Sequence, residues 1–126
     1  MGQKFLIDTN IIIELLGNEV PIYVKEFVNQ LPPIISAVTY IETLGWHKVS
    51  PKQLEPLQAF MDIATILPIS QLVIEKTVVI RQQKRIGLGD AIIAATAIVY
   101  DLTLLTRNYA DFKNITQLNV VNPWDK

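Results

Sequence analysis

Four acidic side chains stand where apolar segments of the sequence meet polar ones: Asp8, Glu42, Asp90 and Asp111. Asp8 follows the apolar run Phe5–Ile7 and Asp90 precedes the apolar stretch 91–100, so both carboxylates are set among residues that should be buried. A buried carboxylate needs a partner, and with few basic residues beside these two a cation is the natural candidate. Sites made of carboxylate oxygens suit Mg²⁺ or Mn²⁺, and such ions hold phosphates and activate water. The predicted chemistry is therefore phosphoryl transfer or phosphodiester hydrolysis.

Each acid also has a purely structural interpretation. Asp8 and Asp90 are well placed to cap helices, a position that Asp favours. Glu42 completes the capping-box pattern that begins at Thr39, whereas a cap at Ser36 would place Glu42 inside the helix and leave its carboxylate free. The fourth acid lies in a loop, where it could be a turn residue. The burial expected around the first two favours the functional interpretation.

The composition removes several other kinds of chemistry. The chain has no cysteine and a single histidine, His47, which excludes disulfide scaffolds, thiolate zinc sites and cysteine nucleophiles. It also leaves little room for histidine-rich metal sites or a serine–histidine triad. Eleven Lys and Arg against twelve Asp and Glu give a net charge of −1, so no bulk positive charge indicates nucleic-acid binding. Any such binding must be local or metal-mediated.

Length and hydropathy favour one domain over residues 1–126. Half of the residues are hydrophobic and the mean hydropathy is +0.31, which is enough apolar material for a well-buried core. The longest uncharged apolar stretch, 91–100, is about half a membrane span, and no signal peptide is visible. We therefore expect a cytoplasmic protein with no membrane partner.

The acids are positioned by an alternation of short apolar runs with segments of helical period, the pattern of an α/β domain with a parallel sheet. Strands are predicted at 4–7, 34–35, 65–67, 103–106 and 118–121. Helices are predicted at 9–16, 21–30, 36–48, 50–61, 70–85 and 91–100. Ligands of such sheets bind beyond the carboxyl ends of the strands, near the topological switch point. The four acids can therefore converge on one end of one sheet.

Four segments of the chain resemble the motifs of the PIN-domain nucleases, in particular the VapC-type toxins of toxin–antitoxin pairs. The matching segments are Leu6-Ile-Asp-Thr-Asn10, Ser36-Ala-Val-Thr-Tyr-Ile-Glu42, Gly89-Asp-Ala-Ile-Ile-Ala-Ala-Thr-Ala97 and Leu105-Thr-Arg-Asn-Tyr-Ala-Asp-Phe112. The resemblance implies a PIN-like α/β/α sandwich around a central parallel sheet of about five strands. It also implies an endoribonuclease dependent on Mg²⁺ or Mn²⁺, and a cognate antitoxin protein that blocks the site.

The same resemblance assigns roles to individual residues. Catalysis and metal binding would be carried by the acidic quartet, with polar support from Thr9, Asn10, Thr106 and Asn108. Asp8 and Asp90 match the family pattern best, and Asp111 lies in the segment that varies most. A metal-activated water would be the nucleophile, so neither a histidine nor a covalent intermediate is required.

Weaker signals concern a basic segment and the aromatic residues. Arg81, Lys84 and Arg85 are either a solvated helix end or a phosphate-binding clamp beside the metal site. If four of the twelve acids are neutralised by metal, eight remain against eleven basic residues, which would allow a polyanion to bind.

His47 is predicted to lie on a helix surface. Trp46 and Trp124 could stack on bases, but core or dimer packing is the simpler interpretation. The apolar excess is consistent with a homodimer or a toxin–antitoxin hetero-oligomer.

Two alternative functions remain at this stage. A haloacid-dehalogenase-like phosphatase also has an Asp after its first strand, but it requires a second Asp two residues later, where this chain has Asn10. A catalytically silent PIN-fold module that only binds the antitoxin is the other alternative, and the complete acidic quartet argues against it. Transfer, ribosomal and messenger RNA are all compatible with the sequence as substrates.

Overall fold

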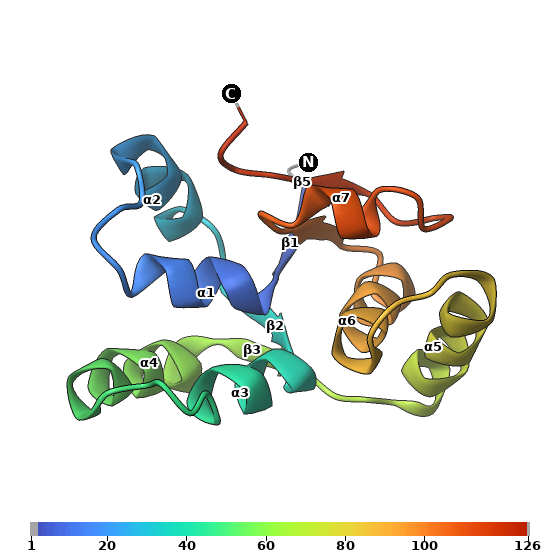
Figure 1. Cartoon of the computed structure of the whole chain (residues 1–126), viewed down its shortest axis with the longest axis horizontal. Coiled ribbons are helices and arrows are strands. Elements are labelled where there is room, and N and C mark those ends of the chain that lie inside the picture. The colour runs from blue at the N-terminus through green and yellow to red at the C-terminus, as the bar shows by residue number, and fades with distance from the viewer. Residues whose placement is uncertain (1–2, 126) are drawn as a thin grey trace.

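The computed structural model describes residues 3–125 and contains five short parallel strands (Figure 1). The strands are β1 (Phe5–Ile7), β2 (Ile34–Ser36), β3 (Thr65–Leu67), β4 (Thr103–Leu105) and β5 (Val120–Val121). They form two parallel ladders, β1-β4-β5 and β2-β3, and β1 also lies beside β2. The order across the molecule is therefore β3-β2-β1-β4-β5. This arrangement confirms the predicted α/β class with parallel strands.

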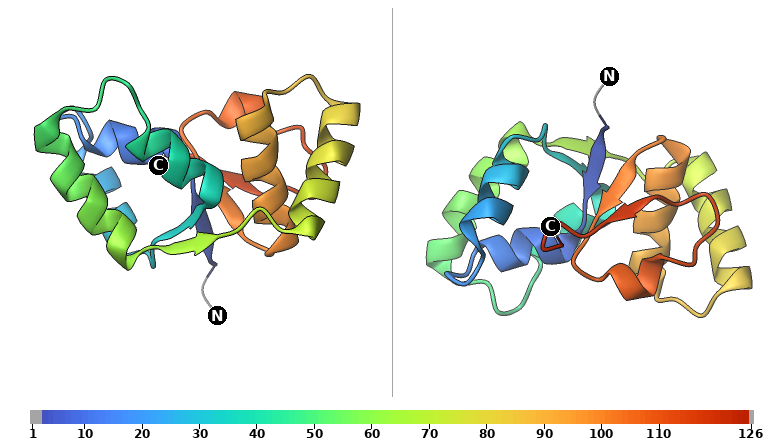
Figure 2. Two further views of the ribbon diagram at one scale, coloured as in Figure 1. Left: turned by 90° about the horizontal axis from the view of Figure 1, so that it is seen from below. Right: turned by 90° about the horizontal axis from the view of Figure 1, so that it is seen from above.

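Helices cover both faces of these strands, as expected of an α/β/α sandwich (Figures 1 and 2). The helices are α1 (Thr9–Leu15), α2 (Ile22–Asn29), α3 (Ala37–Leu44), α4 (Pro51–Ile63), α5 (Gln71–Gln83), α6 (Leu88–Val99) and α7 (Tyr109–Phe112). Within residues 3–125, none of them has the length and apolar character needed to cross a membrane.

Two hydrophobic cores lie on opposite sides of the strands because successive side chains of a strand point to opposite faces. In β1, Leu6 packs into the core formed with α5, α6 and α7, whereas Phe5 and Ile7 pack into the core formed with α1, α2 and α4. In β4 the same alternation sends Leu104 to the first core and Leu105 to the second. The two central strands, β1 and β4, are thus buried on both faces. Their packing fixes the positions of the residues that follow them, Asp8 and Thr106.

Serine caps define three of the helix starts, and each serine is the first residue of a helix predicted from the sequence. Ser50 and Ser70 each accept a hydrogen bond from the backbone of the helix that follows. Ser36 caps α3 through the backbone N–H of Val38, so the capping-box alternative is wrong and Glu42 lies inside the helix.

Helix α3 is shorter than predicted, and this changes the position of two side chains. It ends at Leu44 rather than near residue 48, and Gly45 follows it. A Cβ atom at Gly45 would lie 2.6 Å from the carbonyl oxygen of Ile41, so only glycine fits this exit. Trp46 and His47 therefore lie in a turn. His47 is exposed, as predicted, but the prediction that it belongs to a helix is wrong.

Two further boundaries differ near the predicted site. Helix α6 begins at Leu88 with Gly87 as its cap, which has no side chain to offer, so Asp90 is the third residue of the helix rather than its cap. Helix α7 was expected to be a loop, because four residues are too few to show a helical period.

Candidate active site

The position of Asp8 follows directly from the pairing of β1 with β4. Ile7 pairs with Leu105, and the backbone N–H of Asp8 donates to the carbonyl of Leu105 at 2.9 Å, which brings the next residues, Asp8 and Thr106, side by side. Thr106 Oγ1 donates to Asp8 Oδ2 at 2.7 Å, and the backbone N–H of Thr9 donates to Oδ1 at 2.8 Å. The chain reverses its direction of strand addition between β1 and β4, so Asp8 stands at the switch point where such folds bind ligands.

Burial makes Asp8 a poor place for an uncompensated negative charge. Only 3% of its surface is exposed, and its pKa is raised from 3.8 to about 6, chiefly because burial removes water from the carboxylate. Its hydrogen bonds with Thr106 and Thr9 oppose this rise, and the negative charges of Asp90 and Glu42 add to it. The site therefore favours a ligand that brings positive charge to Asp8.

Glu42 reaches the same region from α3. Thr9 Oγ1 donates to Glu42 Oε1 at 2.7 Å, which links the start of α1 to α3. The other carboxylate oxygen faces α6, because a Cβ atom at Gly89 would lie 2.9 Å from Glu42 Oε2. Gly89, which looks like a turn residue in the sequence, thus makes room for the carboxylate between two helices.

Asp90 faces this carboxylate from the first turn of α6. It is half-buried, and burial together with the charges of Glu42 and Asp111 raises its pKa. No capping hydrogen bond from its side chain is present at this helix start. The cap interpretation is therefore confirmed for Asp8, which caps α1 through the N–H of Thr9, and wrong for Asp90, which lines the pocket from the first turn of α6.

Asp111 is placed differently from the other three acids. It is exposed on α7, where Asn108 Nδ2 donates to its Oδ2 at 2.6 Å. It does not line the pocket that contains the other acids, although its charge contributes to the raised pKa of Asp90. Asp111 thus lies at the margin of the site.

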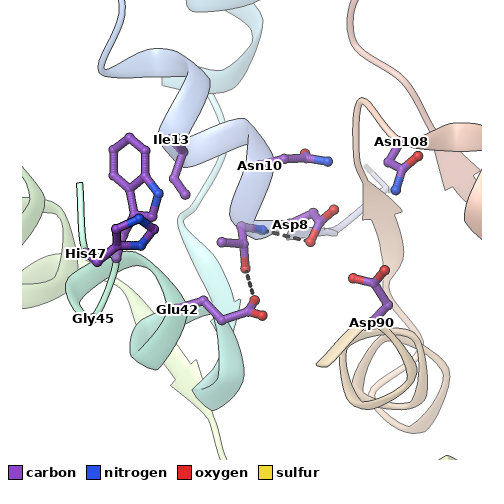
Figure 3. A pocket seen from close by; sticks show the side chains of 10 residues that line it. Asp8, Asn10, Ile13, Glu42, Gly45, His47, Asp90 and Asn108 are labelled. Atoms are coloured by element: carbon purple, nitrogen blue, oxygen red, sulfur yellow. Dashed lines mark hydrogen bonds between the residues drawn. The ribbon is translucent and has the colours of Figure 1, made fainter. Parts of the chain in front are cut away.

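Three of the four acids line one cavity of about 450 Å³ (Figure 3). The lining residues are Asp8, Thr9, Asn10, Ile13, Glu42, Gly45, Trp46, His47, Asp90 and Asn108. No lysine or arginine is among these described residues. Across residues 3–125, no three carboxylate or imidazole groups are close enough as they stand to hold one metal ion. The donor set still fits a hard divalent cation, since it is made of carboxylate, hydroxyl and amide oxygens around a buried Asp8 of raised pKa.

The predicted supporting residues contact one another around Thr106. Its hydroxyl donates to Asp8 and accepts from the backbone N–H of Asn108 at 3.0 Å. Asn10 Nδ2 lies 3.4 Å from the same oxygen. With Thr9 bonded to Glu42, the four polar residues all touch an acid or a group that holds one.

Some residues were missed by the sequence interpretation, and others are not brought to the site. Ile13, Trp46 and His47 form part of the pocket wall. The sequence interpretation did not single out Ile13, and it placed the other two on a helix, with core or dimer packing favoured over base stacking for Trp46. The basic segment lines a separate depression, which shares no residue with the acidic pocket and is formed by Arg81, Gln82, Gln83, Lys84, Arg85 and Ile86. The clamp beside the metal site is therefore not formed by these side chains in this conformation.

Comparison with known proteins agrees with this geometry. A family model described as the PIN domain matches residues 5–118, which include all four acids. The sequence matches none of the curated proteins compared with it. A chain in a toxin–antitoxin complex from Klebsiella pneumoniae is 33% identical with a TM-score of 0.79, and the alignment covers 98% of this chain and 100% of that one.

Two further solved structures are similar along nearly the whole chain. A chain of FitAcB from Neisseria gonorrhoeae is 29% identical with a TM-score of 0.82, covering 97% of this chain and 99% of its own. A chain of the DNA-bound VapBC from Salmonella typhimurium has a TM-score of 0.83 over 97% of this chain and 99% of its own, and at 23% identity it shows likeness of fold alone. The family model and the Klebsiella relative together decide the matter: this chain belongs to the PIN-domain family.

Proposed function

We propose that the chain, as one PIN domain over residues 1–126, is a Mg²⁺- or Mn²⁺-dependent endoribonuclease that acts in the cytoplasm as the toxin of a toxin–antitoxin pair. One observation carries the proposal. Asp8, Glu42 and Asp90 come from three separate segments into one pocket that contains no lysine or arginine among its described residues. Asp8 is buried there with its pKa raised, a cost that binding of a cation would offset.

The residues of the pocket have separate tasks in this proposal. Asp8, Glu42 and Asp90 would hold the cation, with Asp111 joining from the margin. A divalent ion bound there would supply a water of lowered pKa as nucleophile and would neutralise charge on the scissile phosphate. Thr106 and the N–H of Thr9 orient the Asp8 carboxylate, so that both of its oxygens have fixed directions.

The ends of the cleaved RNA test the proposed chemistry. Attack by water on the phosphorus, with cleavage of the bond to the 3′-oxygen, leaves a 5′-phosphate and a 3′-hydroxyl, and it does not use the 2′-hydroxyl of the substrate. A labelled oligoribonucleotide with one 2′-deoxy sugar at the scissile position should therefore still be cut in Mg²⁺, and EDTA should stop cleavage. Products with 2′,3′-cyclic phosphate ends would contradict the mechanism, and cleavage that persists in EDTA would contradict the metal requirement.

The toxin role is supported by the relatives, since the Klebsiella protein comes from a toxin–antitoxin complex. Expression of the chain alone should arrest growth, and co-expression of the antitoxin encoded beside it should restore growth. Sequencing RNA ends after brief induction identifies the substrate. A chain that binds the antitoxin but cuts no RNA in Mg²⁺ or Mn²⁺ would instead be the silent binding module. Membership of the PIN family favours the nuclease over the haloacid-dehalogenase-like phosphatase.

The assembly is part of the same proposal. We expect the chain to form a homodimer or a hetero-oligomer with its antitoxin. Light scattering on the chain alone and on the co-expressed pair distinguishes these states from a monomer.

A further inference from the structure

The acidic pocket has two chemically different ends. Figure 3 shows Ile13 and His47 on one side, Asp90 and Asn108 on the other, and Glu42 between them. Trp46 belongs to the first group of lining residues by its place in the chain, directly before His47. The cavity of about 450 Å³ lies within the range of roughly 300–1,000 Å³ that is usual for small-ligand sites. A ligand held at the acidic end can therefore also reach the aromatic end.

The backbone of Trp46 is held in a turn, but its side chain is not part of either hydrophobic core. It is half-buried, yet it is absent from both core clusters and from the apolar residues packed against them. Within the described part of the chain its ring has neither an aromatic nor a cationic partner. The turn that carries it is fixed, because the chain leaves α3 through Gly45 and the N–H of Val49 donates to the carbonyl of Trp46 at 3.0 Å.

Trp124, the other tryptophan, shows the contrast. It packs against the second core, and the guanidinium of Arg107 lies 4.5 Å from the centre of its ring. Its carbonyl accepts a hydrogen bond from the Tyr23 hydroxyl at 2.7 Å. Trp124 therefore has a structural explanation, and Trp46 has none outside the pocket.

The chemistry of the pocket restricts how it can hold RNA. No lysine or arginine of the described chain lines it, so phosphates cannot be bound by side-chain cations there. Stacking of a base on an aromatic ring needs no charge and contributes roughly 5- to 150-fold to the binding constant per base. We propose that Trp46 stacks on the base of an unpaired nucleotide next to the scissile phosphate, with Ile13 and His47 completing the surface that receives it. This inference rests on the proposed nuclease function.

Tryptophan fluorescence tests the proposal with a matched pair of variants. The chain has two tryptophans, so W124F leaves Trp46 as the sole emitter and W46F leaves Trp124. Each variant is titrated with unlabelled octaadenylate in Ca²⁺, a cation that also takes oxygen ligands, with intact strands verified on a gel. Binding is followed separately by the anisotropy of a labelled octaadenylate. The emission of W124F should fall by more than half in parallel with binding, while that of W46F should change by a few per cent.

An abasic octamer, which keeps the ribose phosphates and lacks the bases, separates stacking from electrostatics. It should not quench W124F. Replacing Trp46 by Ala should weaken octaadenylate binding by about 5- to 150-fold and leave abasic binding unchanged, with a melting temperature close to that of the parent. Bound octaadenylate without quenching of Trp46, or equal quenching by the abasic octamer, would overturn the proposal. If anisotropy shows no binding of octaadenylate to any variant, the proposed RNA-binding function itself fails.

Discussion

The acidic pocket and the basic end of α5 differ in how firmly their charged groups are held. Both oxygens of Asp8 accept hydrogen bonds, and Glu42 accepts one from Thr9. In the basic segment, Arg81 and Arg85 are exposed, and neither they nor Lys84 forms an ion pair with any carboxylate in residues 3–125. The two carboxylates are thus held at fixed positions, although burial there raises the pKa of Asp8, whereas no carboxylate fixes the side chains of the basic segment.

This difference indicates two kinds of binding. The acidic pocket has the fixed groups of a site for one ligand, whereas the basic end of α5 is a surface that attracts polyanions in general. Charged groups that are fixed in place and shielded from water interact more strongly with the charge that develops in the transition state. Catalysis by a bound cation requires such groups to hold the cation. Mobile surface cations raise the local concentration of a polyanion and add salt-dependent binding. Figure 1 shows α5 at the edge of the molecule, away from α1 and α3 that bear part of the pocket. Changes in the two regions should therefore affect different steps.

The largest expected effect comes from removing the most firmly held carboxylate. D8N should lower the rate of RNA cleavage by at least about 10²- to 10³-fold, the loss typical of a preorganised electrostatic group. D111N should lose only about 10- to 100-fold, because Asp111 is exposed and lies outside the pocket lining. Initial rates with a labelled oligoribonucleotide in Mg²⁺ measure both, with circular dichroism as the test of folding. Equal losses would place Asp111 among the fixed groups.

The sequence was sufficient to predict that Asp8 lies at the carboxyl end of a buried strand, because local features determine this position. A single charge at the end of an apolar run marks the carboxyl end of a buried strand, and the alternation in Phe5–Ile7 fixes which side chains point to which core. Ser36 was predictable as a cap for the same reason, since capping involves only the next few residues.

The parts that could not be predicted depend on contacts between distant segments. Gly87 and Gly89 resemble a turn in the sequence, and only the packing of α6 against α3 shows that Gly89 accommodates the Glu42 carboxylate within a helix. The same holds for Trp46, whose place in the pocket depends on α3 ending at Gly45. Helix period indicates that a helix exists, but its end is decided by such contacts.

The raised pKa of Asp8 predicts how the stability of the metal-free protein depends on pH. The pKa is about 6 in the folded protein and near 3.8 in the unfolded chain, so between these values the folded state binds more protons. The free energy of unfolding should therefore fall as the pH rises through this window. Above it the full cost applies, on the order of 3 kcal/mol at most and less where water enters the pocket.

The variant D8N isolates the pH-dependent part of this contribution, because Asn has no charge to bury and can still accept from the N–H of Thr9. Its amide nitrogen cannot accept from the Thr106 hydroxyl as Asp8 Oδ2 does, but this loss is the same at every pH. Urea unfolding in EDTA at pH 5, 6, 7 and 8 should show the parent losing stability relative to D8N as the pH rises to 7, with no further change at pH 8. A constant difference across the series would mean that Asp8 does not carry the electrostatic cost assigned to it.

Replacing Asp90 should weaken metal binding without lowering the stability of the metal-free protein. D90N removes repulsion from Glu42 and Asp111 and breaks no capping hydrogen bond, so in EDTA it should melt at or above the temperature of the parent. Mg²⁺ at a hundred times its Kd would stabilise the parent by about 2.7 kcal/mol, or on the order of 10 °C, and D90N should gain less than half of that.

The control for Asp90 is D101N, which removes the same charge from an exposed residue. Asp101 has a φ of 55°, a conformation that Asn also tolerates, and it lies in the turn before β4, at the opposite end of that strand from the pocket. The rise in melting temperature that Mg²⁺ gives D101N should equal that of the parent. A D90N protein that melts far below the parent in EDTA would show that Asp90 is mainly structural.

The smallest effect is expected from the basic end of α5. Reversing Lys84 and Arg85 to Glu should weaken RNA binding and reduce the dependence of log K on log salt by about 1 to 1.5, since each phosphate contact on a single strand contributes roughly 0.7. The double reversal K4E/K52E changes the net charge equally at exposed sites outside both pockets, so it measures the long-range part alone. The cleavage rate at saturating RNA should be unchanged in both, because neither pair lines the acidic pocket. A lower rate at saturating RNA in K84E/R85E, but not in the control, would show that the basic segment acts in the cleavage step. The two regions would then not affect separate steps.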